Sequence, residues 1–316
     1  MRDALEQLRR NITSVYMGNV QAVDRLLVCL LARGHVLIED VPGVGKTVLA
    51  NALAKSVRCS FSRIQCTPDL LPSDITGVSV FLREQENGHV GDGRFEFRRG
   101  PIFANVVLAD EINRTTPRTQ SAMLEAMSEG TVSAEGQVLQ LPQPFIVVAT
   151  QNPYEFEGTY FLPENQLDRF LMRISLGYPA PDDESRILMK QPARTSLKDL
   201  QPVMSAEEVT EAQAAVDRVR MDQSLVDYVI HLATATREHE DLQVGVSPRG
   251  SLALAQAAKA TAVLRGRDYC EPEDVVQNVL AVCSHRVISK SYLHAGDTHT
   301  TRRIMQRVLE TVPSPA

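Results

Sequence analysis

Two glycines, a lysine and a threonine fall within a short stretch near the start of the chain: Gly43, Gly45, Lys46 and Thr47. Glycine has no Cβ, so backbone N–H groups beside it can approach a bound anion closely. A lysine at this spacing can reach the β- and γ-phosphates of a nucleotide, and the adjacent hydroxyl can ligate Mg²⁺. The pattern therefore predicts a phosphate-binding loop. We expect its nucleotide contacts to come from Pro42, Gly43, Val44, Gly45, Lys46, Thr47 and Val48.

The residues on either side of this loop predict the strand and the helix that a phosphate-binding loop connects. The apolar run that begins at His35 predicts a buried strand, and residues 46–55 predict a helix. The N-terminus of that helix would add a partial positive charge. The strict pattern places a glycine where this chain has Asp40, and the departure concerns the first turn of the loop. The alternative is a glycine turn between a structural strand and a helix.

Paired carboxylates, Asp110 and Glu111, end a second apolar run at residues 104–111. In an α/β sheet, the carboxyl ends of the strands face the ligand crevice. Asp110 could hold Mg²⁺ through water, and Glu111 could polarise the water that attacks the γ-phosphate. An Asp-Glu pair often only opens a loop, but the phosphate loop roughly 60 residues upstream favours the catalytic interpretation.

Two further polar residues follow or precede predicted strands. Asn152 ends the strand that starts at Phe145, where it could lie beside Glu111 and orient water or touch the γ-phosphate. An asparagine in a turn before Pro153 is the plain alternative. Arg169 ends a short helix before a last strand at residues 171–176. An arginine held there is well placed to project from the domain surface, or it could be a solvated surface arginine.

Composition sets limits on the class of protein. The chain has 316 residues, of which 43% are hydrophobic and 23% charged, with no apolar run near the ~20 residues that a membrane span needs. Its start lacks the apolar core of a signal peptide, so we expect a cytoplasmic location. Five scattered cysteines predict reduced core residues. The net charge of −6 gives no overall attraction to nucleic acid, although a local basic pore stays open as an alternative.

The order of predicted elements indicates two parts. Residues 1–190 predict an α/β core that starts with helices, with β-hairpin insertions near 78–98 and 130–143, the first of which could equally be a surface loop. A bend at residues 17–19 could lay Tyr16 or Met17 on a purine or could be a plain turn between helices. Pro179, Pro181 and residues 191–201 predict a linker, and residues 191–316 a helical domain. Its expected helices cover 209–219, 224–237, 251–264, 272–285 and 301–312.

Together these motifs resemble the MoxR family of AAA+ ATPases. They run in family order along nearly the whole chain, at residues 39–47, 67–77, 100–105, 110–114, 149–153, 157–160, 166–170, 247–249 and 264–269. The resemblance implies a P-loop NTPase core, an α/β fold in which helices flank a parallel sheet, with a smaller all-helical lid. It also implies ATP and Mg²⁺ as cofactors. A loop with aspartate at the position of Asp40 also occurs in the family. The family often has glutamine where Asn19 stands and an aromatic residue where Cys66 stands.

The resemblance also implies a role for each candidate residue. Lys46 and Thr47 match Walker A, Asp110 and Glu111 Walker B, Asn152 sensor 1, Arg249 sensor 2, and Arg169 the arginine finger that reaches a neighbouring subunit. Arg114, Arg118 and Arg173 are nearby rivals for the finger.

Three functions compete at this point. The resemblance favours an ATP-hydrolysing, hexameric ring that remodels or matures protein complexes and metalloenzymes, with a von Willebrand factor A domain protein as partner. The alternative is a nucleic-acid-translocating motor, which the pI of about 5.7 and the lack of a separate DNA-binding module do not favour. The third is a nucleotide-gated switch, which would not need the water-activating carboxylate of Glu111.

Overall fold

The computed structural model describes residues 1–82, 85–86, 89–90, 94–134, 136–153, 159–190, 196–291 and 298–315. Its centre is a sheet of five parallel strands in the order β11-β1-β10-β7-β2. The strands are β1 (Val36–Glu39), β2 (Phe61–Gln65), β7 (Val106–Asp110), β10 (Ile146–Gln151) and β11 (Met172–Ile174). The near-continuous apolar runs of β1, β7 and β10 are buried because helices cover both faces. The predicted α/β fold is thus confirmed.

Side chains alternate between the two faces of the sheet, so the hydrophobic core has one cluster on each face. Val36 and Ile38 face one hydrophobic cluster with α1 (Arg2–Val15), α2 (Val20–Leu31) and α3 (Lys46–Ser56). Leu37 faces the other with α4 (Pro72–Thr76) and α5 (Pro117–Glu129). Successive side chains on a strand point to opposite faces, so β1, β7 and β10 each contribute to both clusters. A short 3₁₀ helix, η1 (Ile112–Arg114), and α6 (Glu164–Leu167) complete this part.

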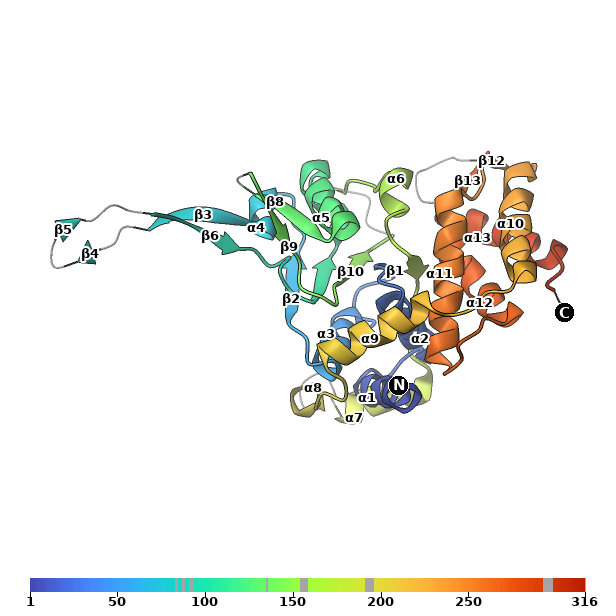
Figure 1. Cartoon of the computed structure of the whole chain (residues 1–316), viewed down its shortest axis with the longest axis horizontal. Helices are drawn as coiled ribbons and strands as arrows, with labels where there is room; N and C mark the ends of the chain where they lie inside the picture. Colours follow the sequence, from blue (N-terminus) through green and yellow to red (C-terminus); the bar gives the residue numbers. More distant parts are fainter. Residues whose placement is uncertain are drawn as a thin grey trace.

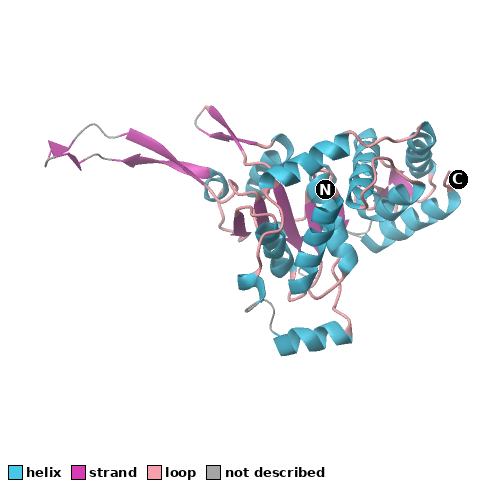
Figure 2. Ribbon diagram, turned by 60° about the horizontal axis from the view of Figure 1, so that its bottom comes forward, coloured by secondary structure: helices cyan, strands magenta, loops and turns pink. Residues whose placement is uncertain are grey.

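Two antiparallel hairpins leave the body on the side opposite the C-terminal helices (Figures 1 and 2). β3 (Gly77–Leu82) pairs with β6 (Arg94–Arg99) in a long ribbon that carries β4 (Gln85–Glu86) and β5 (His89–Val90) near its tip. β8 (Thr131–Ala134) pairs with β9 (Gln137–Gln140). Within 78–98, the described residues 78–82, 85–86, 89–90 and 94–98 thus lie in strands, as a hairpin requires, rather than in the alternative loop. Positions 83–84, 87–88, 91–93 and 135 of the two expected hairpins lie outside the described residues.

The C-terminal part is mostly helical. It contains α8 (Ser196–Asp199), α9 (Ala206–Asp217), α10 (Gln223–Glu238), α11 (Pro248–Leu264), α12 (Pro272–Cys283) and α13 (Thr298–Thr311), with the strand pair β12 (Leu242–Val244) and β13 (Ile288–Ser289). Its helices from α10 onward gather at the other end of the molecule, whereas α8 and α9 lie beside the core near α3 (Figure 1). Ser205 and Glu208 cap α9 reciprocally, as their spacing predicts. Buried residues of α9, α11 and α12 share one apolar cluster with α2, so this part packs continuously on the core.

Two helices differ from the sequence prediction, and one of them is α8, which lies within the expected linker of residues 191–201. Residues after Pro179 were expected to form a linker, whereas α7 (Pro181–Lys190) is helical. Pro181 is its first residue, a position where proline costs no hydrogen bond because that N–H would have no helical partner. Residues 191–195 of the expected linker lie outside the described residues. Among the described helices, none is both long and apolar enough to cross a bilayer.

Candidate nucleotide site

The loop between β1 and α3 is shaped to receive an anion. Gly43 and Gly45 have φ angles of 89° and 93°, in the left-handed region that favours glycine. In the described part of the chain, no protein acceptor takes the N–H groups of Gly43, Val44 or Gly45. A Cβ placed on Gly43 would have no atom within 4 Å. Unpaired N–H groups in front of a helix N-terminus form a ready anion site, so these residues fit a triphosphate.

Lys46, the first residue of α3, lies over this loop. Its Nζ donates to the carbonyl of Asp40 at 2.6 Å, which holds the side chain across the turn. Burial lowers the pKa of Lys46, while the carboxylates of Asp40, Asp110 and Glu111 oppose that shift. The lysine therefore stands among carboxylates from several segments, where an incoming phosphate would give it a closer anionic partner.

The Asp40 carboxylate makes structural contacts that the glycine of the strict loop pattern could not make. One oxygen of its carboxylate accepts from the backbone N–H of Leu176 and Gly177, both at 2.7 Å, and from the Ser175 hydroxyl at 2.8 Å. The other oxygen accepts from the N–H of Val41 at 2.9 Å. Burial would raise the pKa of Asp40, but these hydrogen bonds outweigh it and lower the pKa. Asp40 thus joins the start of the loop to the chain that leaves β11.

Asp110 lies at the end of β7 and is held from both neighbouring strands. Thr150, on β10, donates its hydroxyl to Oδ1 of Asp110 at 2.7 Å. Arg63, on β2, donates to Oδ2 at 2.6 Å. These contacts fix the carboxylate at the carboxyl edge of the sheet, the edge on which the phosphate loop also opens.

Glu111 has an unusual backbone. Its φ of 59° is in the left-handed region, which costs a non-glycine residue of order 1–3 kcal/mol and often marks a functional site. Its N–H is held by the Thr150 hydroxyl at 2.8 Å. Its carboxylate accepts from Arg114 at 3.2 Å and from the Gln65 amide at 3.4 Å. The chain therefore turns sharply after β7 and presents this carboxylate beside Asp110.

Arg63, Gln65 and Thr150 are members of the site that the sequence analysis missed. Arg63 and Gln65 lie on β2 and Thr150 lies on β10, the two strands that flank β7. Gln65 is in register with Asp110. In the sequence, these three residues are visible as polar residues in the C-terminal parts of β2 and β10. Asn152, which the sequence analysis did select, directly follows β10 and is 8% exposed.

Tyr16 lies in the turn between α1 and α2, close to the phosphate loop. A Cβ on Gly45 would approach its ring to 3.3 Å, so the ring lies along the phosphate loop. Burial and the nearby Asp40 carboxylate raise the pKa of Tyr16 to about 12. The phenol therefore stays neutral in this position.

Arg249 lies at the start of α11 and reaches Asp168, the residue that follows α6. Its Nε is 3.5 Å from Oδ2 of Asp168, although 62% of its side chain is exposed. The other carboxylate oxygen of Asp168 accepts from Arg286 at 2.7 Å. Arg286 follows α12, is 3% exposed and also donates to the carbonyls of Asp168, Phe170 and Leu171. Arg286, to which no sequence motif pointed, joins the helical part to the loop before β11.

Arg169 is held within its own chain. Its Nη1 donates to the carbonyl of Leu124 at 2.7 Å and to the Ser128 hydroxyl at 2.9 Å, both on α5. Among its rivals, Arg173 is 10% exposed and pairs with Glu39 on the adjacent strand, which does not suit a surface role. Arg114 pairs with Glu111, and Arg118 is exposed at the start of α5.

These features define a class of protein. A phosphate loop follows the first strand of a parallel sheet whose strands, counted along the chain, lie in the order 5-1-4-3-2. Paired carboxylates end the third of these strands, and a helical part supplies an arginine from α11. This is the arrangement of an AAA+ ATPase with its lid.

Comparisons with known proteins identify the family. Residues 35–172 match the model of the ATPase family associated with various cellular activities (AAA), and residues 234–308 match the AAA lid domain. The chain is 49% identical over 278 residues to Uncharacterized protein YeaC of Bacillus subtilis (strain 168), covering 88% of this chain and 85% of that protein. It is 40% identical over 320 residues to Chaperone MoxR1 of Mycobacterium tuberculosis, covering 98% and 82%.

A solved structure agrees with this assignment. The crystal structure of a candidate ATPase from Cytophaga hutchinsonii superposes with a TM-score of 0.88 at 35% identity, covering 100% of this chain and 96% of that one. The chain belongs to the MoxR family of AAA+ ATPases.

Proposed function

We propose that this protein binds ATP with Mg²⁺ at the loop of residues 42–48 and hydrolyses it. One observation carries the proposal: the free N–H groups of the loop open on the same sheet edge as Asp110 and Glu111. A magnesium nucleotide needs donors for its phosphate oxygens and carboxylate oxygens for its cation, and this edge offers both.

Each candidate residue has a role in this proposal. Lys46 binds the β- and γ-phosphates, and Thr47 and Asp110 hold Mg²⁺, which when bound offsets phosphate charge. Glu111 takes a proton from the attacking water as general base. Asn152 orients that water or contacts the γ-phosphate. The hydrogen bonds from Arg114 and Gln65 support the base by keeping its carboxylate at the sheet edge.

Two arginines would complete the site from outside the core. Arg249 would contact the nucleotide from the lid, and Arg169 of a neighbouring subunit would reach the γ-phosphate in a hexameric ring. Each has an intrachain partner, Asp168 for Arg249 and α5 for Arg169. Nucleotide binding would therefore replace the contact of Arg249 with Asp168, and ring assembly would replace the contacts of Arg169 with α5.

We further propose that hydrolysis drives chaperone-like remodelling or maturation of protein complexes, metalloenzymes among them, in the cytoplasm. The name of the relative Chaperone MoxR1 supports this reading, and the family resemblance implies a partner with a von Willebrand factor A domain. The β3–β6 ribbon extends far from the body, where it could reach a protein client (Figure 1).

The Glu111→Gln variant tests the chemistry. It should bind ATP normally and hydrolyse it at least ~10²-fold more slowly, the usual scale for losing a general base. Glu125→Gln, on the exposed side of α5, is the matched control and should keep wild-type turnover. Isothermal titration would measure binding and phosphate release would measure turnover. Glu111→Gln turnover within a few-fold of wild type would place the catalytic base elsewhere.

Subunit mixing tests the ring. Arg169→Ala and Glu111→Gln subunits should each be poorly active alone. If Arg169 acts across the interface, mixed rings contain some complete sites and activity returns in part, since a finger can contribute 10³–10⁵ in rate, the upper end in GTPases. Rings shown to be mixed by labelled-subunit exchange, yet inactive, would contradict the trans role and direct attention to Arg114 or Arg118.

The nucleic-acid motor is tested in the same assay. A translocating motor should hydrolyse ATP faster when DNA or RNA is added at low salt, where phosphate contacts are strongest. A remodelling ATPase should instead retain a specific protein on an affinity-tagged Glu111→Gln trap loaded with ATP, and release it when the nucleotide is removed.

A further inference from the structure

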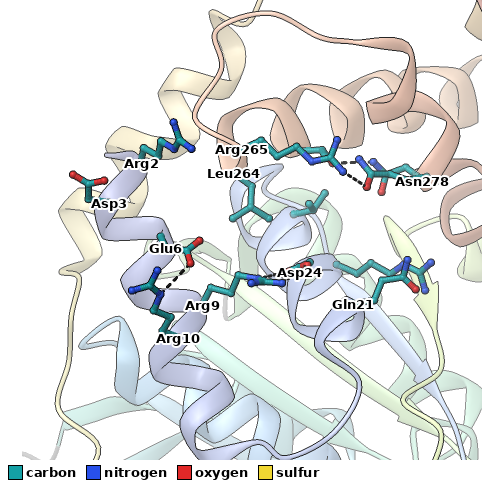
Figure 3. Close-up of a pocket in the computed structure, with 14 residues that line it drawn as sticks. Arg2, Asp3, Glu6, Arg9, Arg10, Gln21, Asp24, Leu264, Arg265 and Asn278 are labelled. Carbon is teal, nitrogen blue, oxygen red and sulfur yellow. Dashed lines mark hydrogen bonds and ion pairs between the residues drawn. The ribbon is translucent and has the colours of Figure 1, made fainter.

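A large polar cavity lies between the first two helices and the lid, apart from the nucleotide site (Figure 3). Its volume is about 920 Å³. One wall comes from α1 and α2, and the other comes from the end of α11, Arg265 and α12. The volume is within the range of small-molecule sites, which runs from about 300 to 1,000 Å³.

The charge of this cavity is opposite to that of the chain. Its lining includes five arginines and three acids, a formal excess of two positive charges, whereas the chain carries −6. The arginines are Arg2, Arg9, Arg10, Arg25 and Arg265, and the acids are Asp3, Glu6 and Asp24. A positive cavity on an acidic protein favours an anionic ligand.

Most of these charges are already paired within the wall. Arg9 forms a two-pronged ion pair with Asp24, and Arg10 pairs with Glu6 at 3.0 Å. Arg265 pairs with the buried Asp274 at 3.2 Å. These pairs leave two arginines, Arg2 and Arg25, without a carboxylate partner in the described part of the chain. Asp3 is the only lining acid that these pairs leave over, and it is exposed.

Arg25 is the strongest feature of the cavity. It projects from α2, is half-buried, and makes no hydrogen bond or ion pair within the described residues. Burial lowers its pKa, and the positive charge of Arg302 on α13 lowers it further. A partly desolvated guanidinium beside a second arginine is unfavourable unless an anion joins it. The fork of donors on arginine suits a phosphate in particular.

Two further groups supply hydrogen-bond donors. The stem of Arg2 lies against Gly266, where a Cβ would come within 2.5 Å of it, so Arg2 is held near the end of α11. Gln277 accepts from Arg265 through its oxygen at 2.8 Å, which leaves its buried Nε2 without a partner in the described part of the chain. The unpaired groups of the wall are therefore mainly donors, as an anion requires.

We propose that this cavity binds a phosphorylated small molecule of nucleotide size, with Arg25 and Arg2 as its principal phosphate contacts. The ligand would touch the core through α1 and α2 and the lid through α11 and α12. Because Arg249 lies at the opposite end of α11, an occupant would bias the position of the arginine assigned to the nucleotide. The regulatory part rests on the proposed ATPase, but the binding part does not.

Binding is tested first in a Lys46→Ala background, which weakens the phosphate loop, with inorganic pyrophosphate as the probe. Thermal shift and isothermal titration at matched ionic strength should show saturable binding. Arg25→Ala should weaken it at least about tenfold, Arg2→Ala should weaken it less, and Arg25→Lys should weaken it in part, because charge remains without the fork. Arg186→Ala, exposed on α7, is the matched control.

The outcomes separate the possibilities. Saturable binding that depends on both Arg25 and Arg2, in variants with unchanged melting temperature without ligand, supports the site. Binding that ignores both substitutions, or no saturable binding, overturns it. Tighter binding of ADP than of pyrophosphate would identify a nucleotide as the occupant, and tighter binding of a sugar phosphate would identify a metabolite. An acidic peptide that binds where pyrophosphate does not would overturn the small-molecule assignment.

Discussion

Replacing Asp40 with alanine should destabilise the core although the residue makes none of the proposed catalytic contacts. The carboxylate accepts the N–H groups of Leu176 and Gly177, and Leu176 is buried. Asp40→Ala leaves these two donors unsatisfied, and each costs about 1–3 kcal/mol. The expected loss of unfolding free energy is therefore roughly 2–6 kcal/mol. Asp40→Gly, which restores the strict loop pattern, should lose slightly more because glycine gains more freedom on unfolding.

Two measurements test this prediction. The urea midpoint should fall for Asp40→Ala, less for Asp40→Asn, and little for Asp182→Ala, an exposed aspartate in the first turn of α7. Hydrogen exchange should show faster exchange at the amides of Leu176 and Gly177, with β1 and β10 still protected. A wild-type midpoint together with protected amides at both positions would refute the assignment of these hydrogen bonds.

Acid should reduce the difference between the wild type and Asp40→Ala. The hydrogen bonds to Asp40 lower its folded pKa, in spite of burial, below the unfolded value of about 3.9. A carboxyl group with a depressed folded pKa contributes stability above its unfolded pKa and loses it as the pH falls through the folded pKa. The two proteins should therefore converge below about pH 4, and a difference that persists unchanged there would contradict the role of the charge.

Three further predictions concern other residues. Lys46→Ala should lose most ATP affinity, measured by titration, because a charge-assisted contact to two phosphates disappears; unchanged affinity would refute the phosphate loop. Burial lowers the pKa of His35 to about 4, so stability should be full above about pH 6.5 and fall by roughly 3 kcal/mol toward pH 4, and His35→Gln should flatten this profile in urea titrations. Arg286→Ala should lower unfolding free energy by about 3–5 kcal/mol in the same assay, because Asp168 and three carbonyls lose a buried donor, whereas Arg186→Ala should lose little.

The sequence was informative where one segment carries its own signal. The loop at residues 42–48 shows its glycines, lysine and threonine together, and buried strands such as β7 and β10 are continuous apolar runs. Contacts between segments were not predictable in this way. Thr150 meets Asp110 only because β10 and β7 are neighbours in a particular register, and Arg286 meets Asp168 across 118 residues of chain.

The expected linker shows a second limit of sequence reasoning. Proline marks a break within a helix, but at the first helical position it is well tolerated, and Pro181 occupies that position in α7. The composition of residues 179–190 could not distinguish these two uses. Burial gives little help either, because Leu188 and Met189 of α7 are both strongly exposed.

The shared carboxylate of Asp168 has a thermodynamic consequence. Arg286 binds one oxygen in a buried contact, and Arg249 binds the other at the longer distance of 3.5 Å. If a bound phosphate draws Arg249 away from Asp168, the free energy of breaking that contact is subtracted from nucleotide affinity. Linkage requires the converse, so any partner that turns the lid and weakens this contact must raise nucleotide affinity by the same factor. Asp168→Asn would reduce this competition but also weaken the contact with Arg286, so the change in affinity that it causes in the wild type, less the change in an Arg249→Ala background, would measure the coupling.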